Sequence, residues 1–261
     1  MHLWHQYVWE KQSLTQLSQK HRRSIPWIRK ILKEIKSVPN NALPQPLVLI
    51  GDVTFFNRSD GVIVFRSPRL KQNILWNFTK TETVSIYREA RYILEQRGFR
   101  IQAMVLDGRK GVREVFSDIP VQMCHFHQLA ILKRYLTSKP KLLAGQELQL
   151  ISKTLPLTTE SIFTKRFDDW YEKWVDFIRE KTFKEDGVHW QYTHKKIRAS
   201  YRSLKTNLPF LFTFQKYPEL HIPNTTNSLD GFFSHMKKLL RVHSGLSKEF
   251  RNKVVSEILR R

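Results

Sequence analysis

The order of apolar runs between residues 47 and 124 constrains the fold more than any other feature of the sequence. Three short strand-like runs come first, and turn-rich segments separate them. An amphipathic helical pattern, a fourth run, a short helical pattern and a fifth run follow. The expected strands are 47–50, 61–65, 73–78, 101–106 and 119–124, and the expected helices are 84–94 and a short one from about Arg109.

The boundaries of the helix at 84–94 also follow from the sequence. Thr79 and Glu82 predict a capping box before it, and Gly98 predicts its end. The order of elements matches that of a ribonuclease H-like core. We therefore expect an α/β fold with a ribonuclease H-like five-stranded mixed sheet, a helical insertion and a preceding all-α segment.

Residues 1–38 are expected to form a helix-turn-helix segment. Apolar residues recur every three or four positions on both sides of a polar turn, and Ser24 followed by Pro26 suits the start of the second helix. The basic turn and outer face favour binding in a major groove, although a helical hairpin that packs on the next domain remains an alternative. The basic residues are Arg22, Arg23, Arg29, Lys30, Lys33 and Lys36.

The rest of the chain divides by composition. Three prolines and two asparagines in ten residues predict a stiff linker, placed at 39–46. Residues 47–133 hold the first part of the core, 134–222 an all-helical insertion, and 223–261 the completion of the core. A regular aromatic face between Phe163 and Ile178 is expected to be buried in the insertion rather than to stack on bases.

The net charge is strongly positive. Lys and Arg number 45 against 23 Asp and Glu, which gives a formal charge of +22. Nucleic acid is the favoured partner, because the basic residues are spread along the chain rather than gathered on one helix as at a membrane surface; charge kept for solubility stays an alternative. One cysteine rules out an internal disulfide and suggests a reducing compartment, and neither a signal peptide nor a membrane span is expected.

Two aspartates are expected at the ends of buried strands. Asp52 follows the run at 47–50, and Asp107 follows the run at 101–106. Two carboxylates about 4 Å apart repel each other by about 4 kcal/mol at an effective dielectric near 20, and a divalent cation reverses this. A turn-forming role for each aspartate remains open, since Asp107 precedes Gly108.

A third carboxylate lies on a helix predicted after residue 223. Its apolar side is opposite a row formed by Asp230, Ser234, Lys237 and Arg241. One surface thus combines a carboxylate with phosphate-seeking cations. A favourable interaction of Asp230 with the helix dipole explains that residue equally well.

Four segments together resemble the motifs of bacterial insertion-sequence DDE transposases related to Mutator-like elements. They are Gly51-Asp52-Val-Thr-Phe-Phe, Leu106-Asp107-Gly-Arg-Lys110-Gly, Val121-Gln-Met-Cys124-His-Phe-His127-Gln and Thr225-Thr-Asn227-Ser-Leu-Asp230-Gly-Phe-Phe-Ser-His-Met-Lys237. The resemblance covers about residues 47–245 and implies that Asp52, Asp107 and Asp230 bind metal and catalyse the reaction. The family normally has Glu at the third position, one methylene longer than Asp230.

The resemblance also assigns supporting residues. Cys124 and His127 match a Cys-x-x-His motif, but two ligands are too few for structural zinc, so we expect packing or hydrogen bonding. His125 is expected to be a neighbour without a role. Asn227 supports the third acid, and Lys110, Lys237 and Arg241 would bind DNA.

The resemblance implies a DNA transposase that uses Mg²⁺ or Mn²⁺. Its partners would be double-stranded DNA, as terminal inverted repeats and target DNA, and further copies of itself in a homodimer or larger assembly on DNA. It would work in the bacterial cytoplasm at the nucleoid, without a membrane. A catalytically decayed, transposase-derived DNA-binding protein and a ribonuclease H-like nuclease or resolvase remain alternatives.

Overall fold

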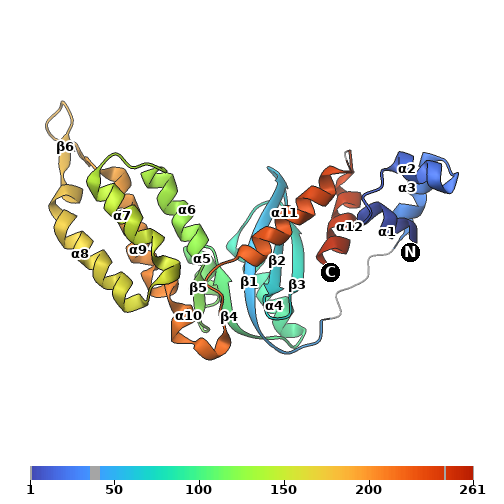
Figure 1. Cartoon of the computed structure of the whole chain (residues 1–261), viewed down its shortest axis with the longest axis horizontal. Helices are drawn as coiled ribbons and strands as arrows, with labels where there is room; N and C mark the ends of the chain where they lie inside the picture. The colour runs from blue at the N-terminus through green and yellow to red at the C-terminus, as the bar shows by residue number, and fades with distance from the viewer. Residues whose placement is uncertain (1, 36–41, 244, 261) are drawn as a thin grey trace. The chain divides into compact units, whose positions relative to one another are not determined.

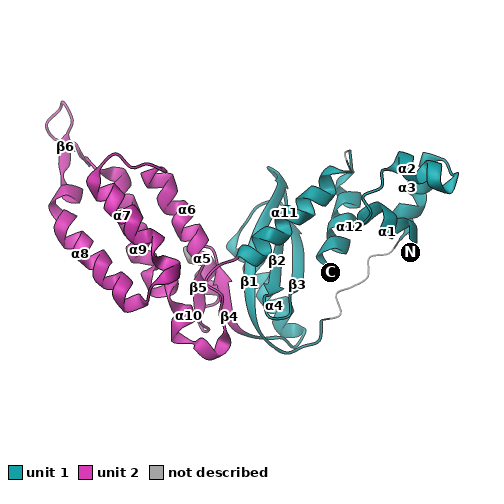
Figure 2. Cartoon of the chain, viewed as in Figure 1, with its two compact units in different colours: residues 1–101, 227–261 teal, residues 102–226 magenta. Residues whose placement is uncertain are grey.

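A computed structural model describes residues 2–35, 42–243 and 245–260 of the chain, with only the backbone of Lys110 (Figure 1). The chain divides into two compact units, which are described separately: unit 1 is residues 1–101 with 227–261, and unit 2 is residues 102–226 (Figure 2). Lys36 and positions 39–41 of the expected linker lie outside the described residues. Pro46, its last expected residue, already begins β1.

The sheet has five strands in the order β3-β2-β1-β4-β5. The first three are antiparallel neighbours, and β4 and β5 run parallel. This mixed sheet, in the strand order of a ribonuclease H-like fold, confirms the predicted α/β core. The helix-turn-helix expected before the core stays a prediction. The strands are β1 Pro46–Asn57, β2 Asp60–Ser67, β3 Gln72–Thr79, β4 Arg100–Leu106 and β5 Val121–Met123.

In unit 1, helices α4 (Val84–Gln96) and α11 (Asn227–Arg241) cover opposite faces of the strands. The ring of Phe65 on β2 contacts Tyr87 of α4 at a centroid distance of 5.9 Å. The next residue, Arg66, lies 5.3 Å over the ring of Phe232 on α11. Because neighbouring strand residues point to opposite faces, the two contacts identify the two covered faces.

The predicted capping box of α4 is wrong. Thr79 ends β3, and its hydroxyl donates to the carbonyl of Thr81. Glu82 instead accepts a hydrogen bond from the Tyr87 hydroxyl at 2.8 Å, and Thr83 precedes the first helical residue. The predicted end is confirmed, since Gly98 has a φ of +79° that favours glycine.

The N-terminal helices belong to unit 1, where α1 and the end of α3 contact α12. The sequence pattern missed α1, whose Trp4 and Tyr7 contact the ring of Phe250 on α12 at 6.1 and 5.8 Å. Ser24 caps α3 as predicted, by accepting from the backbone N–H of Trp27. The helices are α1 His2–Val8, α2 Leu14–His21, α3 Ile25–Glu34 and α12 Lys248–Leu259.

Unit 2 is a helical bundle attached to the end of β4 and to β5. The predicted aromatic face of α8 is in the core: Phe163, Phe167 and Trp170 are almost fully buried. The bounds are α5 Lys110–Val115, α6 His125–Leu136, α7 Leu143–Lys153, η1 Leu155–Leu157, α8 Glu160–Arg179, β6 Lys181–Phe183, β7 Trp190–Tyr192, α9 Lys195–Leu211, α10 Thr213–Lys216 and η2 Pro218–Leu220.

The expectation of an all-helical segment at 134–222 is wrong at one place. Strands β6 and β7 form an antiparallel hairpin between α8 and α9. Threonine and aromatic residues favour strands here, and Gly187 adopts the positive φ of +64° in the turn. Short runs of three residues carry too little periodicity to be recognised in a helical context.

Within the described part of the chain, every helix is too short or too polar to cross a bilayer.

Candidate active site and nucleic-acid interface

Asp52 lies in the middle of β1, not at its end as predicted, because the strand continues to Asn57. Asp52 is paired opposite Val64, and Ile50 is paired opposite Arg66. Residues that are directly opposite, and those two apart, point to the same sheet face. Asp52 therefore faces the side on which Arg66 meets α11. Its carboxylate is partly buried and accepts the N–H of Val53 at 2.8 Å.

Asp230 lies in the first turn of α11, the helix that covers the Asp52 side of the strands. The predicted apolar side is confirmed, with Leu229, Phe233, Met236 and Leu239 buried. Asp230 and Lys237 are partly buried, whereas Ser234 and Arg241 are exposed. Asp230, Lys237 and Arg241 thus share one side of α11, and Asp52 lies on the face of the sheet that α11 covers.

Asp107 follows β4 directly, as predicted. Its carboxylate accepts the backbone N–H of Arg109 at 3.2 Å, an Asx-type turn that leads into α5. Arg113, one turn along that helix, is only 6% exposed. Burial lowers the pKa of the Arg113 guanidinium, and the negative charges of Asp107 and Glu114 act against that shift.

A hydrogen-bonded chain holds Arg113 beside Asp107. Arg113 donates to Asn207 Oδ1 at 2.9 Å, and Asn207 donates to Gln128 Oε1 at 2.7 Å. The guanidinium also lies 4.4 Å over the ring of Phe210. Helices α5, α6 and α9 are thereby joined by polar contacts near the carboxyl end of β4, where the second acidic motif begins.

The donor set of the three aspartates suits a hard divalent cation, because Mg²⁺ prefers carboxylate oxygens. Asp52 and Asp230 belong to unit 1, and Asp107 belongs to unit 2. Among the residues that the structure describes, no three His, Cys, Asp or Glu side chains are grouped closely enough to hold a metal ion.

The structure brings two sequence motifs together at Cys124. The buried thiol lies 3.3 Å from the Thr226 hydroxyl and also accepts the N–H of Thr226, which precedes Asn227. Burial raises the pKa of the Cys124 thiol, but hydrogen bonds from His127 and Thr226 outweigh burial and hold the pKa below its usual value. Asn227 itself is exposed as the first residue of α11.

His125 is more than the neighbour that the sequence suggested. Its ring is fully buried, and Nε2 bonds the carbonyl of Leu211 at 2.6 Å. The rings of Phe212 and Phe214 approach it edge-on at 6.0 and 5.6 Å. Burial lowers the pKa of His125, so the imidazole is neutral at neutral pH. It ties α6 to the end of α9.

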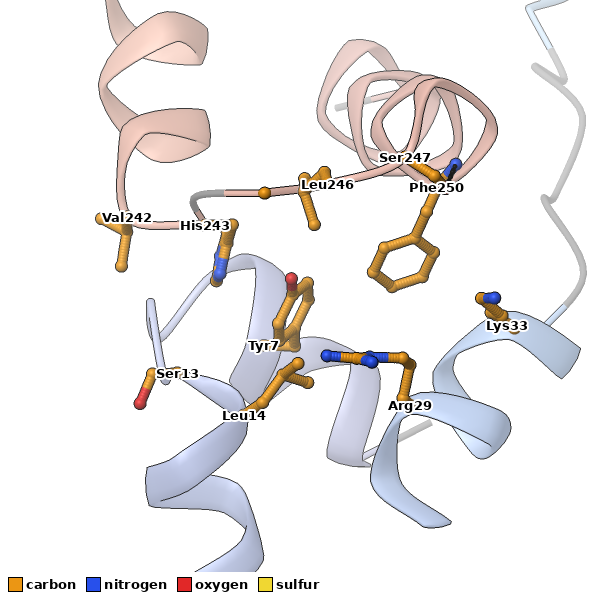
Figure 3. A pocket seen from close by; sticks show the side chains of 11 residues that line it. Tyr7, Ser13, Leu14, Arg29, Lys33, Val242, His243, Leu246, Ser247 and Phe250 are labelled. Carbon is orange, nitrogen blue, oxygen red and sulfur yellow. Dashed lines mark hydrogen bonds between the residues drawn. The ribbon is translucent and has the colours of Figure 1, made fainter. Parts of the chain in front are cut away.

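The basic residues predicted on the helix-turn-helix segment divide into two groups. Arg22, Arg23 and Lys30 are exposed, and Arg23 lies 5.2 Å over the Trp27 ring. Arg29 and Lys33 are exposed too, as expected, and in addition they line a cavity of about 360 Å³ together with residues of α1 and of the segment between α11 and α12. Figure 3 shows the Arg29 guanidinium reaching toward Tyr7.

The electrostatics of that cavity follow from burial. Burial raises the pKa of Tyr7 to about 12, and the charge of Arg29 acts against the rise. The Tyr7 ring stacks on His243 at a centroid distance of 3.9 Å. Arg29 therefore interacts electrostatically with Tyr7 of α1.

Sequence reasoning missed Arg113, Asn207, His243 and Arg251. These four residues belong to no motif or periodic pattern in the sequence. Their positions in the structure depend on packing against elements that are distant in the chain. Lys237 and Arg241, which were predicted, line a second cavity with Arg251 and His243. The side chain of Lys110 lies outside the described residues, and its backbone begins α5.

No model of a known protein family matches the chain, and no curated protein matches it in sequence. Two solved structures are similar in part. One is the Drosophila P element transposase strand transfer complex, with 11% identity and a TM-score of 0.45 over 99% of this chain and 91% of that chain. The other is a simian T-cell lymphotropic virus intasome in complex with the PP2A regulatory subunit B56 gamma, with 13% identity and a TM-score of 0.24 over 60% of this chain and 69% of that chain. At this level of similarity neither structure assigns an activity to the chain.

Proposed function

We propose that the chain is a DDE/D-type DNA transposase of an insertion sequence. It binds the terminal repeats of its element, cleaves a DNA strand and transfers the freed end to target DNA. Asp52, Asp107 and Asp230 are the proposed metal-binding and catalytic residues. DNA is the partner that a net charge of +22 favours.

The observation that carries this proposal is the position of the acidic motifs relative to the sheet order. Asp52 lies on β1 and Asp107 directly follows β4, and these strands are neighbours in the sheet. Asp52 also faces the side covered by α11, whose first turn holds Asp230. The motifs of Asp52 and Asp230 thus lie on a strand and on the helix that covers that side of it, within unit 1.

The three carboxylates would hold two Mg²⁺ or Mn²⁺ ions, which when bound activate an attacking oxygen and neutralise charge on the scissile phosphate. Lys237 and Arg241 lie one turn apart on the side of α11 that bears Asp230. They bind DNA phosphates and position the strand next to the carboxylates. Arg22, Arg23 and Lys30 contact the element ends, and the assembly on DNA contains two or more copies of the chain.

Changing Asp107 to Asn tests the proposal. The variant removes a charge but keeps the size and the acceptor oxygen for the Arg109 N–H. We expect nicking of a plasmid that carries the DNA flanking this reading frame, with Mg²⁺ or Mn²⁺, to fall by at least about a hundredfold. DNA affinity in a gel-shift assay should change by less than about threefold. Unchanged nicking by Asp107→Asn contradicts the assignment.

Asp230 provides a further test, because the resembled family normally has Glu there. Asp230→Asn should abolish nicking, and Asp230→Glu should retain it. A wild-type protein that binds DNA without nicking it, together with an active Asp230→Glu variant, identifies a decayed transposase instead. Cleavage without strand transfer identifies a nuclease or resolvase.

A further inference from the structure

A cavity of about 450 Å³ in unit 1 opens between the end of β1, the end of α11 and the start of α12. Its volume is within the range of about 300–1,000 Å³ that is typical of small-molecule pockets. The walls combine two aromatic rings with three cationic side chains and one imidazole. These lining residues are Phe55, Phe56, Lys237, Arg241, His243 and Arg251.

Strand β1 presents two consecutive aromatic side chains to this cavity. In a regular strand, neighbouring residues point to opposite faces. Here the register against β2 shifts between Phe55 and Asn57, so that Phe56 is the extra residue of a bulge. Both rings are only partly buried. The bulge therefore turns two neighbouring rings toward one space.

The position of the Phe55 ring depends on a glycine in β2. A Cβ at Gly61 would lie 2.7 Å from Cδ1 of Phe55 and 2.8 Å from the carbonyl oxygen of Thr54. Such distances are too short for ordinary contacts, so the ring rests where only glycine leaves room. The aromatic wall of the cavity thus depends on two features: the bulge at Phe56 in β1, and a glycine at position 61 in β2 that leaves room for the Phe55 ring.

The three cations of the cavity have different surroundings. Arg251 forms an ion pair with the buried Asp60, and its guanidinium lies 5.4 Å over the ring of Phe56. Lys237 and Arg241 have no ion pair with any residue of the described ranges. Arg251 therefore holds the wall in place, while Lys237 and Arg241 offer positive charge to a ligand.

His243 lines this cavity and also the cavity of about 360 Å³ beside Tyr7. Its side chain is only 7% exposed, and it stacks on Tyr7. Its Nε2 has no hydrogen-bond partner among the described residues. Buried polar atoms without partners are uncommon, so Nε2 is free to bond a polar group that enters either cavity.

We propose that this cavity binds one unpaired nucleotide of DNA, with its base stacked on Phe56 and its phosphate held by Lys237 and Arg241. Aromatic rings next to cations are the usual means of binding single-stranded nucleic acid, because every base has a face that stacks. A paired base cannot use these rings, since its faces are covered by its neighbours in the duplex. The inference rests on the proposed function and specifies that this surface binds an unpaired nucleotide rather than paired duplex DNA.

A fluorescent base tests the inference directly. The probe is a short duplex with one extrahelical 2-aminopurine, and the matched probe has the same base paired with thymine. We expect the full-length protein to quench the extrahelical base and to bind that probe about tenfold more tightly than the paired probe, as measured by anisotropy. Phe56→Leu, which keeps an apolar side chain but removes the ring, should abolish both the quenching and the preference.

Two further variants make the outcome decisive. Phe56→Tyr keeps the ring and should keep the preference, whereas Tyr92→Leu removes a 61% exposed ring on α4 and should change nothing. Equal binding of the two probes by the wild type, or a preference that survives in Phe56→Leu, overturns the inference and leaves the proposed function standing. A wild type that binds neither probe overturns the proposed function itself.

Discussion

Two buried histidines show at the residue scale how a fold changes the chemistry of a side chain. The His125 ring bonds a backbone carbonyl and packs against the rings of Phe212 and Phe214, and the His243 ring stacks on Tyr7. Burial lowers the pKa of both imidazoles below the usual histidine value of about 6.5. Their neutral form is therefore the form that the native state accommodates.

The sign of the resulting pH dependence follows from linkage. The unfolded chain takes up these protons near pH 6.5, whereas the native state takes them up only at lower pH. The stability that the neutral histidines contribute is complete above about pH 6.5 and is lost as the pH falls toward the lowered native pKa.

We predict that the melting temperature falls between about pH 7 and about pH 5, by about 2–4 °C for each kcal/mol of stability lost. His125→Gln should lower the melting temperature at neutral pH and make it less sensitive to acid. Differential scanning calorimetry at the two pH values measures this. His235→Gln, at an exposed position of α11, is the matched control. Equal acid sensitivity of wild type and His125→Gln contradicts the prediction.

At the element scale, a lysine of α12 caps the C-terminal end of α3. Lys253 Nζ donates to the carbonyls of Leu32 and Lys33, the latter at 2.6 Å, and it lies 5.6 Å from the Trp4 ring centroid. The last carbonyls of a helix lack partners within the helix and carry partial negative charge, so a cation there is stabilising. This contact fastens the N-terminal helices to the core.

We predict that Lys253→Met destabilises this attachment by about 1–2 kcal/mol, because the variant keeps the apolar stem but removes the donor. The N-terminal helices should be released first. Limited proteolysis should then cleave within residues 1–45 faster than elsewhere. Lys238→Met, at an exposed position of α11, serves as the control. Cleavage at the wild-type rate in Lys253→Met would show that the cap does not hold the segment.

At the scale of the whole molecule, the charge balance dominates the expected behaviour toward DNA. A net charge of +22 attracts any polyanion, so affinity alone does not identify the binding surface. The salt dependence of binding identifies that surface when variants are compared. Each contact with a phosphate of duplex DNA contributes about 0.9 to the steepness with which log affinity falls against log salt concentration.

We predict that the double variant Lys237→Ala, Arg241→Ala lowers that slope by about 2 when duplex binding is titrated against salt. The double variant Lys139→Ala, Lys141→Ala removes the same charge from the exposed loop between α6 and α7 and should lower it by less than about 1. If both double variants lower the slope equally, the affinity for DNA depends on the total charge of the protein and not on a binding surface on α11.

Much of the fold was predictable from local patterns. The five strands, α3 with its Ser24 cap and the apolar side of α11 each follow from a period or a capping signal within a few residues. The errors arose where the local signal was weak or ambiguous. Strand β1 runs on past Asp52, α1 has no complete apolar period, and three-residue strands interrupt the bundle.

The candidate site was predictable only as a set of residues. The acidic motifs, Lys237 and Arg241 are visible in the sequence because their types and spacing carry the chemistry. The catalytic assignment of the three aspartates stays a prediction. The partners that shape their surroundings, Arg113 with Asn207 and Arg251 with Asp60, are separated by 94 and 191 positions and leave no local trace.

The sequence by itself determined the fold class, since hydrophobic periods and the succession of strands and helices along the chain are properties of the chain read in order. Only the tertiary structure decided that Cys124 meets Thr226, that Arg29 contacts Tyr7, and that Phe55 and Phe56 face one cavity. Periodicity specifies which face of an element is buried. Which distant side chain fills the space against that face depends on packing, which no short segment encodes.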